Sequence, residues 1–515
     1  MERWHGLLEY VQFPLKILFF GVVLLGLGSS VLNPNLNYIW QVDNEYIIRI
    51  CEMLKYIGGF MIQIFPLIVF IKVLSKRFED SVPVLIGFFG LIILYIGILF
   101  FMKTDLPTYF YNDVLGIEIN FTKSKIFAEG YLVPYNMGII PIVATYFITK
   151  FAYLRSRHHS MHGVLSFIDH DAWAMLSVFV CCLITGILFA FIWPLIVQGI
   201  EFIHNFIADD ITSPINLFYY GLIDRISEIL HMSDITHSAF WMGEAGGSLI
   251  DASGIKHVGD VAIWTYQATN SLDLTAGRFI TPYYIMNIFM IPGFLLGYYS
   301  LVKSKRDRSR YLMFFILAVV LSILCGNTFP FEIFMLVMAP LLYVTYLIIS
   351  AMLFAVFQIL NVHIGYNLSG TLMTANPGSL LDLIPYFRNP DMVRSIITVL
   401  VVGIICFLLF FMLTRIYFKK FALGLLQLGN RSEVAEKVVN ALGGIDNILA
   451  IESSPDKLTA SLINRDLVDF EALKENGAYL ILQAKEGYLI RLGNISTIVG
   501  ADINHLLKQK QWKAE

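Results

Sequence analysis

Glu332 is an acidic residue inside a long apolar stretch of this sequence. The stretch, CGNTFPFEIFMLVMAPLLYVTYLI, covers residues 325–348 and begins with a Gly-Asn-Thr turn followed closely by Pro330. A carboxylate at membrane depth is costly, so it is a candidate for function wherever it occurs. The alternative is a structural role, in which the acid binds backbone groups at the broken end of a helix. Asn327 and Thr328 have the same two interpretations, because they could contact a ligand or cap the helix that follows.

The composition places this acid in a membrane protein. Of the 515 residues, 57% are hydrophobic and 15% are charged, whereas a soluble protein carries roughly a quarter charged residues. Mean hydropathy is +0.69. Apolar runs of about 20 residues recur and predict a polytopic α-helical membrane protein. We expect about ten spans, near residues 13–32, 56–74, 82–102, 131–153, 172–200, 214–230, 281–302, 311–327, 336–360 and 393–418.

Basic clusters predict which loops face the cytoplasm. They are Lys76-Arg77, the run 155–159, the run 303–310, and Arg415 with Lys419-Lys420. The loop at 103–130 is poor in Lys and Arg, and we expect it on the outside.

Successive spans should cross the membrane in opposite directions. The span that ends near residue 230 and the span that starts near residue 281 would both have to run inward, so this alternation fails between them. This stretch, or the one at 361–392, must therefore contain a re-entrant hairpin or an additional crossing. Irregular backbone at membrane depth is tolerated only where it is buried in protein or lines a wet cavity. Transporters place substrate sites at such breaks.

Several classes of function are disfavoured by the sequence. The net charge of −3 provides no basic field for a nucleic-acid partner. The five cysteines lie in or beside apolar runs, and none has metal-ligand spacing. Adjacent side chains in Asp169-His170-Asp171 point in different directions, so we expect no metal site there. We also expect no cofactor. The apolar run from Phe13 lacks a small-residue cleavage site and predicts a span rather than a cleaved signal.

The character of the chain changes after about residue 421. We expect a membrane domain over 1–420, a linker over 421–431 and a small α+β domain over 432–515. Helical patterns at 432–444, 469–477 and 495–509 alternate with strand patterns in 457–463 and 478–493. Lys419-Lys420 place this domain on the cytosolic side.

Five segments, taken in order, carry a resemblance to a known family. They are GILFAFIWPLIVQGI (186–200), FYYGLIDRISEIL (218–230), TAGRFITPYYIMNIFMIPG (275–293), GNTFPFEIFMLVMAPLLYV (326–344), and the tail from ALGGIDNILAIESSPDKL to FEALKENGA. Together they resemble the membrane enzyme IIBC of the bacterial phosphoenolpyruvate-dependent sugar phosphotransferase system (PTS), in its glucose/N-acetylglucosamine/maltose branch. Residues 1–150 match by span pattern only.

The resemblance implies an architecture and a set of partners. It implies a homodimer of ten-span subunits in the lipid of the bacterial cytoplasmic membrane, with two re-entrant hairpins and an elevator-type sugar-binding half (IIC). A cytosolic IIB domain would carry a phosphocysteine, and separate IIA, IIB and HPr-type proteins would supply phosphate.

The resemblance also implies which residues would contact a sugar. Glu332 matches the second Glu of the family's Thr-Glu-Pro-x-Glu motif, and Phe329 replaces the first. Arg225 matches a Glu-Arg pair, either as a sugar contact or as a structural partner of Asp224. The position of the family's site His is occupied by Ser233. We expect the substrate contacts to come from Glu332, Arg225, Thr328, Asn327, His231, Ser233 and Asp234, with Trp241 or Phe329 as possible stacking partners.

The catalytic loop of the IIB-like domain departs from the family pattern. The family has Asp-Ala-Cys-x-Thr-Arg-Leu where this chain has Glu-Ser-Ser-Pro-Asp-Lys-Leu at 452–458. Ser454 thus replaces the phosphorylated Cys, Asp456 replaces Thr, and Lys457 replaces Arg. Serine is a weak nucleophile without an adjacent base, and Lys lacks the planar fork with which Arg binds phosphate. We therefore predict a folded IIB-like domain with no catalytic residue and no phosphate.

The combined prediction is a PTS-type sugar transporter whose own IIB domain does not carry phosphate. Two alternatives remain open: a regulatory pseudo-transporter that senses a sugar or a partner, and a phosphate-independent sugar facilitator. Whether the chain is an enzyme is also open. The ordered motifs argue against a membrane acyltransferase.

Overall fold

The computed structural model describes residues 2–33, 41–78, 80–111, 119–121, 130–156, 169–270, 274–302, 305–366, 377–421, 431–454, 457–484, 487–492, 496, 499–504 and 506–507. They form two compact units, one of residues 13–295 and 317–410 and the other of residues 1–12, 296–316 and 411–515. Each unit has a hydrophobic core of its own.

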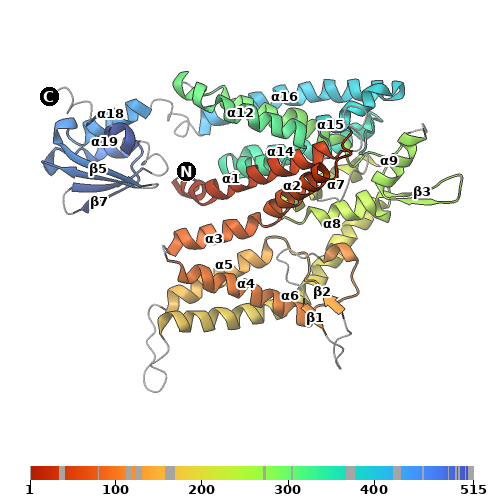
Figure 1. Cartoon of the computed structure of the whole chain (residues 1–515), viewed down its shortest axis with the longest axis horizontal. Coiled ribbons are helices and arrows are strands. Elements are labelled where there is room, and N and C mark those ends of the chain that lie inside the picture. The colour runs from red at the N-terminus through yellow and green to blue at the C-terminus, as the bar shows by residue number, and fades with distance from the viewer. Residues whose placement is uncertain are drawn as a thin grey trace, which may run out of the picture. The chain divides into compact units, whose positions relative to one another are not determined.

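Helices dominate the chain up to residue 421 (Figure 1). Their bounds are α1 Glu2–Val31, α2 Glu45–Gln63, α3 Phe65–Phe78, α4 Val82–Phe101, α5 Ile140–Ser156, α6 His170–Ala208, α7 Pro214–Ile229, α8 Ser233–His237, α9 Asp260–Thr269, α10 Thr281–Ile285, α11 Ile291–Tyr299, α12 Lys305–Cys325, α13 Phe329–Met338, α14 Pro340–Ile359, α15 Leu380–Leu383 and α16 Val393–Phe421. Short strands form two hairpins, β1 Ile119–Phe121 with β2 Gly130–Leu132 and β3 Ser248–Ile250 with β4 Lys256–Val258.

Several of these helices are long and apolar enough to span a membrane. In the part of the chain that the structure describes there are 5, namely Phe13–Val31, α4, α6, α14 and Pro390–Lys419, and the bent pair α2–α3 would make a sixth. The axes of α2 and α3 differ by 49°. The structure thus confirms a polytopic helical protein, and the total of about ten spans stays a prediction.

Helices of the larger unit approach one another closely at glycines. A methyl group at Gly186 of α6 would overlap the backbone of Leu94 in α4, and one at Gly221 of α7 would overlap Phe354 in α14. Small residues of this kind allow close packing between membrane helices.

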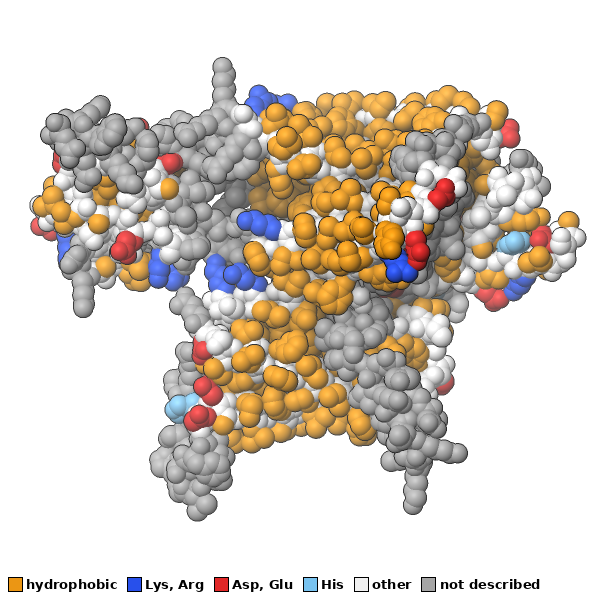
Figure 2. Space-filling model, viewed as in Figure 1, with side chains coloured by type: hydrophobic (Ala, Val, Ile, Leu, Met, Phe, Trp, Pro, Cys, Tyr) orange, Lys and Arg blue, Asp and Glu red, His pale blue; other side chains and the backbone are white. Residues whose placement is uncertain are grey.

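The outer faces of these helices are apolar. On the face shown in Figure 2, hydrophobic side chains cover most of the helical surface. On α6, Phe191, Leu195 and Phe202 are 62%, 65% and 74% exposed. An apolar surface of this extent is typical of a protein whose helices contact lipid.

Two breaks in the helical structure coincide with segments that the sequence marked as irregular. The described residues between 231 and 280 form short helices and the β3–β4 hairpin rather than a single span. Between α12 and α13 the chain is non-helical at residues 326–328, and Gly326 has φ of +63°, a conformation that glycine adopts readily. The re-entrant hairpin or additional crossing that we expect within 230–281 or 361–392 stays a prediction.

The C-terminal part of the smaller unit contains a sheet with its own core. Its 4 strands, β5 Ile448–Ser454, β6 Lys457–Leu462, β7 Leu480–Ala484 and β8 Gly487–Arg491, are ordered β5-β6-β8-β7 and every neighbouring pair is antiparallel. Helices α18 Arg431–Ala441 and α19 Phe470–Glu475 contribute to the same core. Leu442, Leu458, Leu473 and Ile490 are fully buried in it.

Most of the α+β elements predicted after residue 431 are present, with one addition, while the helix predicted at 495–509 lies partly outside the described residues. The strand pattern in 457–463 forms β6, the pattern in 478–493 forms β7 and β8, and the helix predicted at 432–444 is α18. Strand β5 was not predicted. The expected linker falls mostly on residues 422–430, which lie outside the described part of the chain.

Candidate functional site

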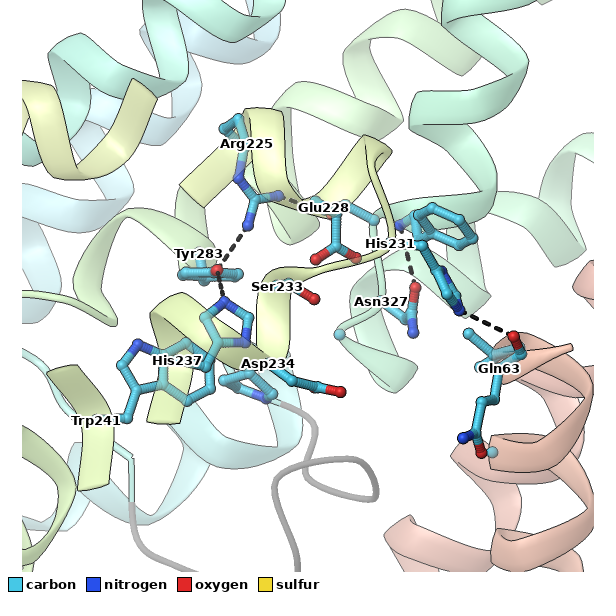
Figure 3. A pocket seen from close by; sticks show the side chains of 16 residues that line it. Gln63, Arg225, Glu228, His231, Ser233, Asp234, His237, Trp241, Tyr283 and Asn327 are labelled. Carbon is cyan, nitrogen blue, oxygen red and sulfur yellow. Dashed lines mark hydrogen bonds between the residues drawn. The ribbon is translucent and has the colours of Figure 1, made fainter. Parts of the chain in front are cut away.

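The larger unit contains a cavity of about 140 Å³ that is lined by polar side chains (Figure 3). Its walls come from breaks and short helices rather than from the middle of long spans. The residues that line it are Gly59, Ile62, Gln63, Arg225, Glu228, His231, Ser233, Asp234, His237, Trp241, Tyr283, Gly326, Asn327, Thr328, Phe329 and Pro377.

Helix α7 supplies Arg225 and Glu228 to the cavity. Because the two residues are three positions apart, their side chains lie on one face of the helix. The helix closes with a Schellman motif, in which Met232 N donates to Ser227 O at 2.8 Å and His231 N donates to Glu228 O at 3.1 Å. His231 therefore has φ of +60°, in a region that non-glycine residues seldom occupy and that often marks functional sites.

His231 connects the end of α7 to the break between α2 and α3. Its Nε2 lies 3.0 Å from the carbonyl oxygen of Gln63, and its ring lies 5.5 Å from that of Phe329. His231 thus holds one wall of the cavity in place, in addition to lining it.

Arg225 uses all five of its N–H groups inside the protein. Its Nε and Nη2 donate to Asp224 Oδ2 at 3.0 and 2.8 Å, and Nη2 also donates to Tyr283 Oη at 2.5 Å. Its Nη1 donates to Glu332 Oε1 at 2.8 Å and to Thr328 Oγ1 at 3.2 Å. A guanidinium carries five donors and no more, so in this conformation Arg225 has none left for a ligand.

The network continues from Asp224 to a residue that the sequence did not select. His237 Nε2 lies 2.8 Å from Asp224 Oδ1 and 3.0 Å from Tyr283 Oη. The His237 ring stacks on Trp241 at 3.9 Å, and Trp241 Nε1 donates to Tyr220 Oη at 2.9 Å. The sequence signal was present, because His237 lies four residues after the Ser233 position and on the same short helix.

Glu332 lies behind Arg225 and not on the wall of the cavity. It is fully buried. Its Oε1 accepts from Arg225 and also from Tyr346 Oη at 2.9 Å, while Tyr343 Oη lies 3.5 Å from its Oε2. The expected direct contact with a ligand stays a prediction, and the geometry favours a positioning role, in which Glu332 holds Arg225.

Six of the seven predicted contact residues lie at the same cavity. They are Arg225, His231, Ser233, Asp234, Asn327 and Thr328. Both aromatic residues considered for stacking, Trp241 and Phe329, also line it. The sequence analysis missed Glu228. Its position three residues after Arg225, on the same helical face, is the feature that could have identified it as a cavity residue.

The cavity is poor in groups that bind phosphate. Among the described residues at its wall, Arg225 is the one Lys or Arg side chain, and its donors are all in use. The wall also carries the carboxylates of Glu228 and Asp234, which repel an anion.

The IIB-like position also lacks the geometry of a nucleophile. Ser454 ends β5, pairs with Lys457 at the start of β6, and its hydroxyl donates to the Lys457 carbonyl oxygen at 3.4 Å. A backbone carbonyl cannot act as the general base that a serine nucleophile needs. Asp456 lies outside the described residues.

The chain is similar to several phosphotransferase-system proteins, although no protein-family model matches it. It is 25% identical over 528 residues to the glucose-specific EIICBA component of Staphylococcus carnosus, and this alignment covers 99% of this chain and 74% of the relative. It is 22% identical over 516 residues to the glucose-specific EIICBA component of Staphylococcus saprophyticus, and this alignment covers 97% of this chain and 72% of the relative.

A third relative is matched over a shorter length. The chain is 27% identical over 340 residues to the glucoside-specific EIICBA component of Staphylococcus carnosus, and this alignment spans 64% of the chain and 47%, about half, of the relative. Among solved structures, the IIC component of an N,N'-diacetylchitobiose-specific phosphotransferase system matches 78% of this chain and 93% of its own at 10% identity, with a TM-score of 0.29. A TM-score this low does not establish a common fold.

Proposed function

We propose that this chain, which is similar over nearly its whole length to glucose-specific EIICBA components of the bacterial phosphotransferase system, binds a sugar in the cavity beside α7 and α8 and carries it across the cytoplasmic membrane. The observation that carries the proposal is the convergence of family-matched positions from distant segments on one cavity. Arg225, Tyr283 and Asn327 come from three of the segments that resemble the family, 218–230, 275–293 and 326–344, and line the same space.

The chemistry of the cavity suits a polyhydroxylated ligand. Glu228 and Asp234 offer carboxylate oxygens as acceptors, and Ser233 offers both a donor and an acceptor. Asn327 Oδ1 accepts from Phe329 N at 3.0 Å, as a capping residue does, and its amide N–H groups are the donors that it offers. Trp241 and Phe329 add apolar surface. A few convergent polar groups beside aromatic rings are the usual composition of a small-molecule site.

We further propose that this chain does not phosphorylate the sugar with its own IIB-like domain. Ser454 has no general base in hydrogen-bond contact among the described residues, and the one cationic Arg at the cavity has no free donor. The IIB-like core is retained, with Leu458 and Leu473 fully buried. A folded domain without phosphate chemistry suits a structural or partner-docking role, with separate IIA or IIB proteins as candidate partners.

Transport assays test the proposal. The purified chain is reconstituted in proteoliposomes, and uptake of labelled hexoses and hexosamines is measured with and without phosphoenolpyruvate, the two general phosphotransfer proteins and a IIA protein. We expect saturable uptake of unmodified sugar in both conditions, and loss of uptake in Asn327→Leu. Asp171→Asn, at an exposed carboxylate on the first turn of α6, is the control.

Two results would contradict the proposal in different ways. Uptake that requires the phosphoryl relay and delivers sugar phosphate would contradict the phosphate-independent part. Sugar binding without uptake would favour the regulatory alternative, in which the cavity senses a sugar and the IIB-like domain reports to a partner.

A further inference from the structure

The charges around the cavity do not balance. Asp224 and Glu332 flank Arg225 and are both fully buried. Glu228 and Asp234 add two more carboxylates at the wall. If His237, which contacts Asp224, is counted as a cation beside Arg225, four carboxylates still face two cations.

Arg225 and His237 both contact carboxylates behind the wall. Arg225 makes two bonds to Asp224 and one to Glu332. His237 lies 2.8 Å from the other oxygen of Asp224. The positive charge of Arg225 is therefore directed at carboxylates behind the wall, and the carboxylates of Glu228 and Asp234 remain toward the cavity.

Glu228 and Asp234 are the carboxylates left at the wall. In the described part of the chain, neither side chain makes a hydrogen bond or a close ion pair with a Lys or Arg. Figure 3 shows the polar ends of Glu228, Ser233, Asp234 and Asn327 turned toward one space. An ionised acid without a partner in a confined cavity is costly, and a ligand that supplies a positive charge removes this cost.

We propose that the cavity selects a sugar that carries a free ammonium group over neutral and phosphorylated sugars. This inference rests on the proposed sugar site and names the class of sugar. An ammonium group supplies three donors and one positive charge, which match the two carboxylates. The sugar hydroxyls then bond to Ser233 and Asn327. An acetylated amine keeps the sugar ring but loses the charge, and a phosphate brings charge of the wrong sign.

Titration calorimetry on the full chain in mild detergent tests the inference. Glucosamine, N-acetylglucosamine, glucose and glucose 6-phosphate are titrated at about pH 6.5, where an amine is mostly protonated. A hydrogen bond to a charged group predicts that glucosamine binds about ten- to a hundred-fold more tightly than glucose or N-acetylglucosamine. Glucose 6-phosphate should bind more weakly than glucose.

Two isosteric variants locate the source of the preference. Glu228→Gln and Asp234→Asn each remove one negative charge from a different helix, so each tests the inference even if the other fails to fold. In each, the ratio of glucosamine affinity to glucose affinity should fall by about ten-fold. Asp171→Asn, which removes an exposed charge away from the cavity wall, should leave the ratio at its wild-type value.

The possible outcomes separate this inference from the proposed function. Equal affinity for glucosamine and glucose, or tighter binding of glucose 6-phosphate, overturns the preference and leaves the sugar site in place. A preference that persists in both cavity variants also overturns it. If none of the four sugars binds, the proposed function fails and the inference fails with it.

Discussion

Arg225 Nη1 lies 2.8 Å from Glu332 Oε1, although the two residues are separated by 107 positions in the sequence. The side chains are 1% and 0% exposed, so the contact is shielded from water. This pair explains the acid in the apolar stretch: Glu332 neutralises a buried cation that also contacts the cavity. Arg225 also makes two hydrogen bonds to Asp224, so it keeps a charged partner when the Glu332 charge is removed.

The first prediction concerns Glu332→Gln. The change keeps the shape of the side chain and removes its charge, so it should destabilise the protein by about 1.5–3 kcal/mol and weaken sugar binding by roughly ten- to a hundred-fold. Thermal unfolding in detergent and titration calorimetry measure the two effects. Unchanged stability with lost binding would instead identify Glu332 as a direct sugar contact, and unchanged binding would remove it from the site.

The second prediction compares two tyrosines of α14 that approach the same acid. Tyr346 Oη lies 2.9 Å from Glu332 Oε1, whereas Tyr343 Oη lies 3.5 Å from Oε2. Since hydrogen bonds weaken steeply with distance, Tyr346→Phe should cost about 1.5–3 kcal/mol and Tyr343→Phe less than half of that. Melting temperatures of the two variants make the comparison, and an equal loss in both would mean that the two hydroxyls bind Glu332 with similar strength.

The third prediction concerns the IIB-like loop. Incubation with labelled phosphoenolpyruvate, the two general phosphotransfer proteins and a IIA protein should leave this chain unlabelled, because serine without a base is a poor phosphoryl acceptor. The triple variant Ser454→Cys, Asp456→Thr, Lys457→Arg restores the family residues and should accept label. Ser453→Cys, one position earlier on β5, is the matched control. Label on wild-type Ser454 that can be chased onto a sugar would refute the prediction.

The fourth prediction is a homodimer, which the family resemblance implies. Light scattering in mild detergent should give a mass of about twice 58.5 kDa after subtraction of detergent. A monomer that retains sugar binding would contradict the dimer and leave the site proposal intact.

The local patterns of the sequence were sufficient for the class of protein and for much of the C-terminal domain. Apolar runs of membrane length and the helix and strand periods of β6, β7, β8 and α18 are properties of neighbouring residues, so they can be read without the fold. Strand β5 escaped because its register shifts between Ile448 and Ala450, so its buried residues Ile448 and Ile451 are three positions apart and the two-residue period is lost. Family-matched positions such as Arg225 and Asn327 were also available from the sequence.

The tertiary structure decided what each of these residues does. Whether Glu332 faces a ligand or a cation depends on how α13 packs against α7, and this packing joins segments more than one hundred positions apart. The same packing uses every donor of Arg225, brings His237 to Asp224, and leaves Glu228 at the cavity wall. Hydrogen bonds act over about 3 Å, so they are set by the path of the backbone through space, which residue types and local spacing do not specify.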